Sequence, residues 1–424
     1  MCDTFAVCPS LTVDGTGIFA KNSDREPDET HLVLSIPGAE HPAGEQLTCT
    51  YVTIPQARVT HAAVICKPFW MWGAEMGVNE KGVVIGNEAL FTTMKPERQP
   101  GLIGMDLLRV ALERASTADE AVEVVIDLLG RYGQAGPCGY RDKKFTYMNS
   151  FIIMDREHII VLETLGRDYA LRHRKDYAVI SNGITLTTDW ERSSLPQGTD
   201  MSAKTDPLIT YFAGSSRRRG SNERGVLDTR GRFSVHHAFS LLRSHAGDEP
   251  YRGFNRDVCM HAGDPLIRKS QTTGSLVVEL HPRGRLRIFV TAGSAPCLTP
   301  FKPFLPAAPW QGAGRGGAMY AKDSTWWTHE AMHVNAMVRP YPYRATITER
   351  IRAMESTWIS DYPSHAWDAH EPSLVNVSHA AFTQAQEADG IFMDRMKGIR
   401  ADTFSLAGYY WRRVARRTGI PVTT

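Results

Sequence analysis

The chain has 424 residues, and its 48 lysines and arginines nearly balance 46 aspartates and glutamates, leaving a net charge of +2. This balance argues against a nucleic-acid-binding protein, which concentrates positive charge on one face. The composition is that of an ordinary globular protein, and no apolar run reaches the roughly 18 residues that a membrane span needs. A dense basic run, Arg217 to Arg219, lies between Gly214 and Gly220, and we interpret it as a solvated loop.

The seven cysteines are an odd number, spread thinly and without a Cys-x-x-Cys pair. The N-terminus also lacks the charged and then apolar layout of a signal peptide. Both features disfavour a disulfide-stabilised secreted protein, so we expect free thiols and a cytoplasmic location.

Short strands separated by turns dominate the first 300 residues. Apolar or β-branched runs at residues 17–20, 61–66 and 82–85 are bounded by Gly, Asp, Asn and Lys. Two amphipathic helices interrupt them. The first follows Met105 to Ala115, and the second starts at a Thr117–Glu120 capping box and ends near Gly130 and Gly133.

Two hairpins follow. Residues 150–155 and 158–163 flank a polar pair at hairpin spacing, and we expect 169–172 and 177–180 to continue this as a meander. Residues 275–280 and 286–291 form the second hairpin. After a proline-rich break at 297–306, four helices are expected, at 326–339, 348–359, 380–397 and 403–417. The class is α+β, with a core at 2–300 and a helical C-terminal extension, 301–424, packed on it.

The N-terminal cysteine is the most reactive feature. The initiator methionine is normally removed when a small residue follows it, which would leave Cys2 with both a thiol and a free α-amine. Their ordinary pKa values are about 8.5 and about 8, so the amine can take the thiol proton and later give it to a leaving amine.

Several ordered motifs accompany Cys2, and with them the sequence resembles the secernin and dipeptidase-A family of N-terminal-nucleophile (Ntn) cysteine hydrolases. Choloylglycine hydrolases and penicillin V acylases are more distantly similar. The motifs are KNSDR at 21–25, WGAEM at 72–76, NEKG at 79–82, GNEA at 86–89, MNSF at 148–151, LET at 162–164 and TTGS at 272–275. The resemblance runs from residue 2 to about 300, and more loosely to the end.

The resemblance implies a four-layer αββα sandwich and a set of catalytic residues. Cys2 would be the nucleophile, and Asp24 the acid that bonds its amine. Lys21 stands where the choloylglycine branch has arginine, which keeps the charge but loses a planar fork of donors. Asn182 would lend its amide to the oxyanion hole, with Asn87 as a second donor. A late catalytic arginine is also implied, but nothing in the sequence assigns it, although Arg268 lies near the TTGS motif.

Other polar residues of these motifs have more than one reading. We name Trp72, Glu75 and Asn79 as candidate substrate-binding residues. Structural roles compete: Asn79 fits a turn, Trp72 a core or pocket wall, and Glu75 and Glu88 internal ion pairs. Asp24, Asn87 and Asn182 could likewise satisfy backbone groups at strand ends.

A zinc-peptidase motif offers an alternative catalytic site. His329, Glu330 and His333 form a literal His-Glu-x-x-His, which on a helix can bind zinc. The metzincin continuation is absent, leaving Glu349 or Glu355 as a third ligand. Two further pairs, His236–His237 and Cys259-x-His261, lack additional ligands at the usual spacing.

The sequence therefore predicts an N-terminal cysteine amidohydrolase that cleaves a dipeptide or a small N-acyl amide. No cofactor or catalytic metal, nucleic acid or membrane partner is expected, and a homo-oligomer is possible by analogy. The alternatives are a zinc peptidase and a non-enzymatic, secernin-like protein with a role in secretion.

Overall fold

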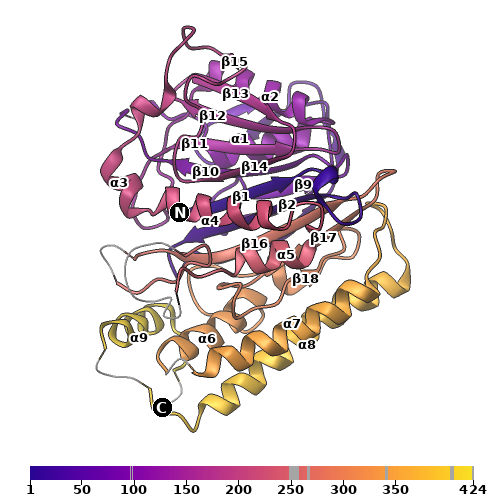
Figure 1. Cartoon of the computed structure of the whole chain (residues 1–424), viewed down its shortest axis with the longest axis vertical. Coiled ribbons are helices and arrows are strands. Elements are labelled where there is room, and N and C mark those ends of the chain that lie inside the picture. The colour runs from indigo at the N-terminus through magenta and orange to yellow at the C-terminus, as the bar shows by residue number, and fades with distance from the viewer. Residues whose placement is uncertain are drawn as a thin grey trace.

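Two stacked antiparallel sheets form the centre of the computed structural model, which describes residues 1–95, 97, 99–247, 257–264, 268–339, 342–401 and 405–422 (Figure 1). The first sheet has the order β14-β1-β2-β16-β17-β18, with strands Tyr177–Ser181, Cys2–Val7, Gly17–Arg25, Gln271–Leu280, Leu286–Val290 and Lys302–Pro303. The second has the order β15-β13-β12-β11-β10-β9-β8-β3, with strands Arg192–Ser193, Asp168–Arg174, Ile159–Leu165, Met148–Met154, Val84–Leu90, Met76–Asn79, Ala63–Pro68 and His31–Ile36. Two small ribbons, β4 (Ala39–Glu40) with β7 (Val59–Thr60) and β5 (Gln46–Thr48) with β6 (Thr53–Pro55), flank them.

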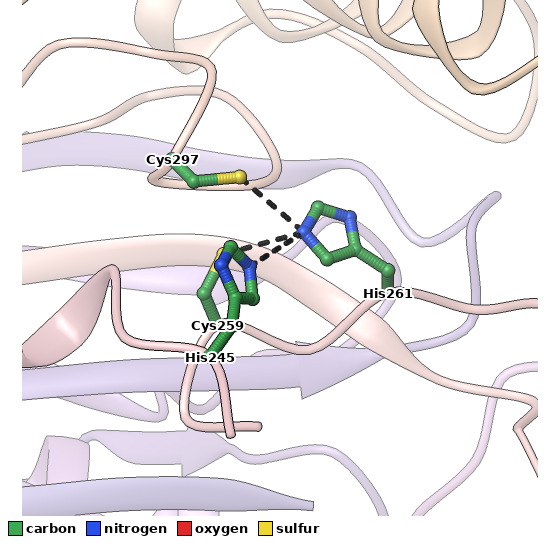
Figure 2. A group of neighbouring side chains, drawn as sticks. All are labelled: His245, Cys259, His261 and Cys297. Carbon is green, nitrogen blue, oxygen red and sulfur yellow. Dashed lines mark hydrogen bonds between the residues drawn. The ribbon is translucent and has the colours of Figure 1, made fainter. Parts of the chain in front are cut away.

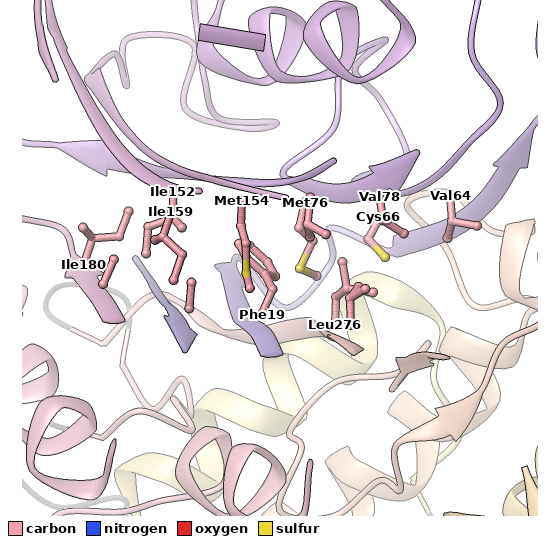
Figure 3. Packing of buried hydrophobic residues seen from close by; sticks show 14 of the residues in the cluster. Phe19, Val64, Cys66, Met76, Val78, Ile152, Met154, Ile159, Ile180 and Leu276 are labelled. Carbon is pink, nitrogen blue, oxygen red and sulfur yellow. The ribbon is translucent and has the colours of Figure 1, made fainter. Parts of the chain in front are cut away.

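Alternation along each strand sorts the side chains into layers. On β2, Phe19 faces the second sheet, whereas Ile18 and Ala20 face the opposite side. Figure 3 shows Phe19 and Leu276 of the first sheet packed against Met76 and Met154 of the second. The main core therefore lies between the sheets.

Helices cover both outer faces. α1 (Gly104–Arg114) and α2 (Ala118–Tyr132) pack on the second sheet. α4 (Ser215–Asp228) and α5 (Val235–Leu242) pack on the first, and the short α3 (Pro207–Phe212) precedes them. The predicted α+β, four-layer αββα architecture is confirmed.

Most of the predicted elements are present. Both hairpins form, with Met154 opposite Ile159 and Leu280 opposite Leu286. The Thr117 side chain accepts from the Glu120 backbone N–H at 3.1 Å, and α2 ends at Gly133, whose φ of 67° suits glycine.

The predicted meander is wrong at its last strand. β13 pairs with β12 as expected, but β14 crosses to the first sheet and pairs with β1. Alternating apolar residues predict a strand, but they carry no information about which sheet accepts it.

The arginine-rich run is also not a loop. It lies in α4, where Ser215, Arg218, Asn222 and Val226 form the buried face. Glycine and serine lower helix propensity. The buried stripe is mostly polar, so hydrophobic periodicity did not reveal the helix.

The C-terminal third is helical, with α6 (Thr325–Met337), α7 (Pro342–Asp361), α8 (Pro372–Met396) and α9 (Leu406–Thr418). These match the four predicted helices, although Thr403 and Phe404, inside the last predicted range, lie outside the described residues. Because β18 extends the first sheet past residue 300, the division at that residue stays a prediction. Within the described residues, no helix is long and apolar enough to cross a membrane.

Candidate active site

Cys2 lies at the start of β1, between β14 and β2 in the first sheet, and helps line a cavity of about 400 Å³. Its backbone is held on both sides. The N–H donates to Asn182 Oδ1 at 2.8 Å, and the carbonyl oxygen accepts from Arg218 Nη1 at 2.7 Å. Burial raises the pKa of the thiol, while the positive charges of Lys21 and the N-terminus act to lower it.

Met1 lies in the same cavity. Its ammonium donates to the Asp24 carbonyl oxygen at 3.1 Å, and its own carbonyl oxygen accepts from the Asp24 N–H at 2.9 Å. Removal of Met1 would thus free space beside the thiol and both backbone groups of Asp24.

A network of buried polar side chains holds the backbone of Cys2. Asn182, just after β14, accepts from Arg218 Nη2 at 2.8 Å and donates to the Ala89 carbonyl oxygen at 3.0 Å. Arg218 also pairs with Asp3, and both side chains are fully buried. Arg218 contacts both Cys2 and Asn182 but is not among the predicted site residues; the three- and four-residue spacing of Ser215, Arg218, Asn222 and Val226 is the signal that could have found it.

Asp24, on β2, lines the cavity directly. Thr272 Oγ1 donates to its Oδ1 at 2.7 Å, and its buried Oδ2 has no hydrogen-bond partner among the residues that the structure describes. Burial raises the pKa of this carboxyl to about 6, against the opposing charges of the N-terminus and Arg218. Oδ2 is therefore an available acceptor beside Cys2.

Lys21 lies between the sheets and does not line the cavity. Its ammonium donates to the Asn22 carbonyl oxygen at 3.3 Å, and its stem passes over Gly86, where a Cβ would lie 2.6 Å from Lys21 Cδ. Burial alone would lower the pKa of Lys21, but the nearby Cys2 and Glu88 raise it overall. Lys21 thus supplies positive charge to the thiol from within the core.

Asn87 faces the cavity, and a chain of amides sets its orientation. The Gly166 carbonyl oxygen accepts a hydrogen bond from Gln134 Nε2, and Gln134 Oε1 accepts one from Asn149 Nδ2. Asn149 Oδ1 in turn accepts one from Asn87 Nδ2. The Asn87 amide also donates to Met105 Sδ, and its buried Oδ1 has no hydrogen-bond partner among the described residues. A backbone carbonyl can only accept, so this chain of amides commits the Asn87 N–H groups to Asn149 and Met105, and the role of Asn87 as an oxyanion donor stays a prediction.

Of the three predicted substrate-binding residues, only Glu75 lines the cavity. Its carboxylate accepts from Arg25 Nε at 2.6 Å and contacts His31 Nε2 at 3.1 Å. Burial alone would raise the pKa of Glu75, but these two partners keep it well below its usual value. Trp72 stacks against Arg109, 4.1 Å from its ring centre, and Asn79 donates to two carbonyl oxygens at the end of α1. Neither Trp72 nor Asn79 lines the cavity, and the contacts of both residues are structural.

The cavity walls combine apolar and charged groups. Phe91, Phe145 and the α3 side chains Leu208, Ile209 and Phe212 form an apolar wall. Glu26, Asp142 and Lys269 add charges of both signs. Such a cavity can accept a small molecule with an apolar group and polar ends.

The His-Glu-x-x-His motif does not form a metal site. His329 is held between Asp389, 3.1 Å from Nδ1, and the Ser294 carbonyl oxygen, 2.9 Å from Nε2. His333 contacts Glu330 and Ser294, and Glu355 pairs instead with Arg243. Among the residues that the structure describes, neither histidine belongs to a set of three ligand atoms within 4.8 Å of one another.

Several known proteins are similar to parts of this chain. The model of the family described as acyl-coenzyme A:6-aminopenicillanic acid acyl-transferase matches residues 13–184. Penicillin V acylase from Agrobacterium tumefaciens superposes with a TM-score of 0.45 at 14% identity, covering 72% of this chain and 86% of that one. The C2A mutant of conjugated bile acid hydrolase from Clostridium perfringens gives 0.41 at 14%, covering 68% and 88%. The Caenorhabditis elegans ortholog of N-acylethanolamine-hydrolyzing acid amidase gives 0.36 at 11%, covering 65% and 92%.

Proposed function

We propose that this protein is an amide hydrolase with the Cys2 thiol as its nucleophile and the Cys2 α-amine, exposed by removal of Met1, as its base. The observation that carries the proposal is the position of Cys2: its thiol lines the cavity while its backbone nitrogen is already held by Asn182. The matching family is described as acyl-coenzyme A:6-aminopenicillanic acid acyl-transferase, and this match supports chemistry on acyl groups.

The reaction would run through an acyl-enzyme. The amine takes the thiol proton, and the sulfur attacks the amide carbon to give a tetrahedral oxyanion. The Asp24 N–H, released from the Met1 carbonyl, is one candidate oxyanion donor. The Asn182 amide is a second, although one of its N–H groups donates to the Ala89 carbonyl oxygen in this structure. The ammonium then protonates the leaving amine, and water hydrolyses the thioester.

The substrate class follows from the cavity. We propose a dipeptide or a small N-acyl amide in a cytoplasmic setting, with the apolar wall around α3 receiving the side chain or acyl group. Lys269, whose side chain is positively charged and which lines the cavity, suits a terminal carboxylate.

Two measurements test the proposal. Intact-mass analysis should find a mature chain without Met1, and Cys2→Ala should lower kcat on a panel of dipeptides and N-acyl amides by about 10⁴-fold or more. Cys8→Ser is the matched control, because Cys8 directly follows the other end of β1 and is half-buried. Full activity with Met1 retained, or an active Cys2→Ala, would refute the mechanism, and no turnover across the panel would favour the non-enzymatic alternative.

A further inference from the structure

Four metal-ligating side chains converge outside the active site. His245 follows α5, Cys259 and His261 precede β16, and Cys297 follows β17 (Figure 2). Their ligand atoms all lie within 4.8 Å of one another. In the sequence, Cys259-x-His261 lacks further ligands at the usual spacing, since His245 lies 14 residues before Cys259 and Cys297 lies 36 residues after His261. Only the fold brings the four together.

The distances match the edges of a tetrahedron around zinc. His261 Nε2 lies 3.2 Å from His245 Nε2, 3.5 Å from Cys259 Sγ and 3.3 Å from Cys297 Sγ. Zinc bonds of about 2.0–2.1 Å to nitrogen and about 2.3 Å to sulfur place tetrahedral ligands about 3.3 Å apart for two nitrogens and about 3.6 Å apart for nitrogen and sulfur. The three distances to His261 Nε2 already have this spacing.

Hydrogen bonding accounts for only part of the arrangement. Three contacts meet at His261 Nε2, and a ring nitrogen carries either one hydrogen or one lone pair. It can therefore complete only one of these contacts as a hydrogen bond, whereas a single cation would bind all four ligands at once. We infer that His245, Cys259, His261 and Cys297 bind one zinc ion.

The site would be structural. All four positions of a tetrahedral zinc are filled by protein, and Cys259, His261 and Cys297 are buried, which leaves no position for water or substrate. None of the four ligand residues lies in a β-strand, so the ion would join three segments that strand pairing does not connect at these positions.

Hydrogen bonds that involve the backbone connect the proposed zinc site to the active site. Asn22 Nδ2 donates to the Leu242 and Val258 carbonyl oxygens at 2.8 and 2.9 Å. The Met260 N–H donates to Thr272 Oγ1 at 2.9 Å, and that hydroxyl donates to Asp24. The ion would therefore also steady the segment that supports Asp24.

Metal analysis tests the site without using turnover. Purified without a metal-binding tag under reducing conditions, the full chain should contain about one equivalent of zinc. Cys259→Ser and Cys297→Ser should each retain less than about a tenth of it, and Cys66→Ser, another buried thiol, should retain it all. Zinc removal should also lower the melting temperature by several degrees.

Cobalt provides a readout that does not depend on the folding of a variant. The metal-free wild-type chain, refilled with Co²⁺, should acquire thiolate-to-cobalt charge transfer and the intense visible bands of tetrahedral cobalt. His245→Gln, which changes the half-buried ligand, should weaken this uptake. A folded chain with neither zinc nor cobalt uptake, or a Cys259–Cys297 disulfide found by mass, would overturn the inference. Metal content does not depend on hydrolysis, so failure here is distinguishable from failure of the proposed function.

Discussion

Glu88 and Lys21 are both buried between the two sheets, where their charges are far from solvent. Glu88 accepts from Thr4 Oγ1 at 2.7 Å, and burial raises the pKa of its carboxyl to about 8, despite the nearby Lys21. The protonated form is therefore favoured in the folded chain at neutral pH.

This raised pKa predicts a specific pH dependence. The unfolded chain loses the Glu88 proton near its ordinary pKa of about 4.3, whereas the folded chain keeps it up to about pH 8. The folded state binds more protons in between, so this group's contribution to stability falls as pH rises through that window. Relative to Glu88→Gln, the wild type should lose on the order of 3 kcal/mol of unfolding free energy between pH 5 and pH 8.

Urea denaturation across that pH range measures the difference. Glu157→Gln is the control, because Glu157 is exposed in the turn between β11 and β12. A constant difference between wild type and Glu88→Gln at every pH would contradict the prediction.

At the scale of one element, α4 is a helix held by polar rather than apolar contacts. Its Arg218 reaches Asp3 and Asn182, whereas Arg217, one residue earlier, is exposed. Successive residues on a helix point about 100° apart, so two adjacent arginines have entirely different surroundings.

The two arginines should therefore respond differently to the same change. Arg218→Met leaves Asp3 buried without its partner and should destabilise the protein by about 3–5 kcal/mol. Arg217→Met should change stability by less than about 0.5 kcal/mol. Urea denaturation measures both, and adding Asp3→Asn to Arg218→Met should recover part of the loss because no unpaired charge remains. Equal effects of the two substitutions would show that α4 does not present this face.

At the scale of the whole molecule, a buried ion pair ties the C-terminal helices to the core. Glu355 of α7 pairs with Arg243 at the end of α5, and accepts from the Phe301 N–H at 2.6 Å. The predicted extension thus shares its interior with the sandwich.

Breaking this pair should destabilise the entire chain. Glu355→Gln leaves the Arg243 charge without its counter-ion and should cost about 3 kcal/mol in unfolding free energy, with a single cooperative transition retained. Glu349→Gln, an exposed change on the same helix, is the control. Separate unfolding of residues 301–424 in the Glu355 variant would instead indicate an independent domain.

The sequence by itself determined the local structure and the reactive residue. Strand alternation, turn residues and the Thr117 cap depend on neighbours in the chain, so both hairpins and the helix caps could be predicted. Cys2 could be singled out because its thiol and latent amine belong to one residue.

Only the tertiary structure decided which distant polar groups meet. It moved β14 into the first sheet, buried Arg218 against the Cys2 backbone, joined the Asn87 amide to Asn149 and assembled His245 with Cys259, His261 and Cys297. The physical reason is that burial of a polar side chain depends on the partner that satisfies it, and these partners lie far away along the chain.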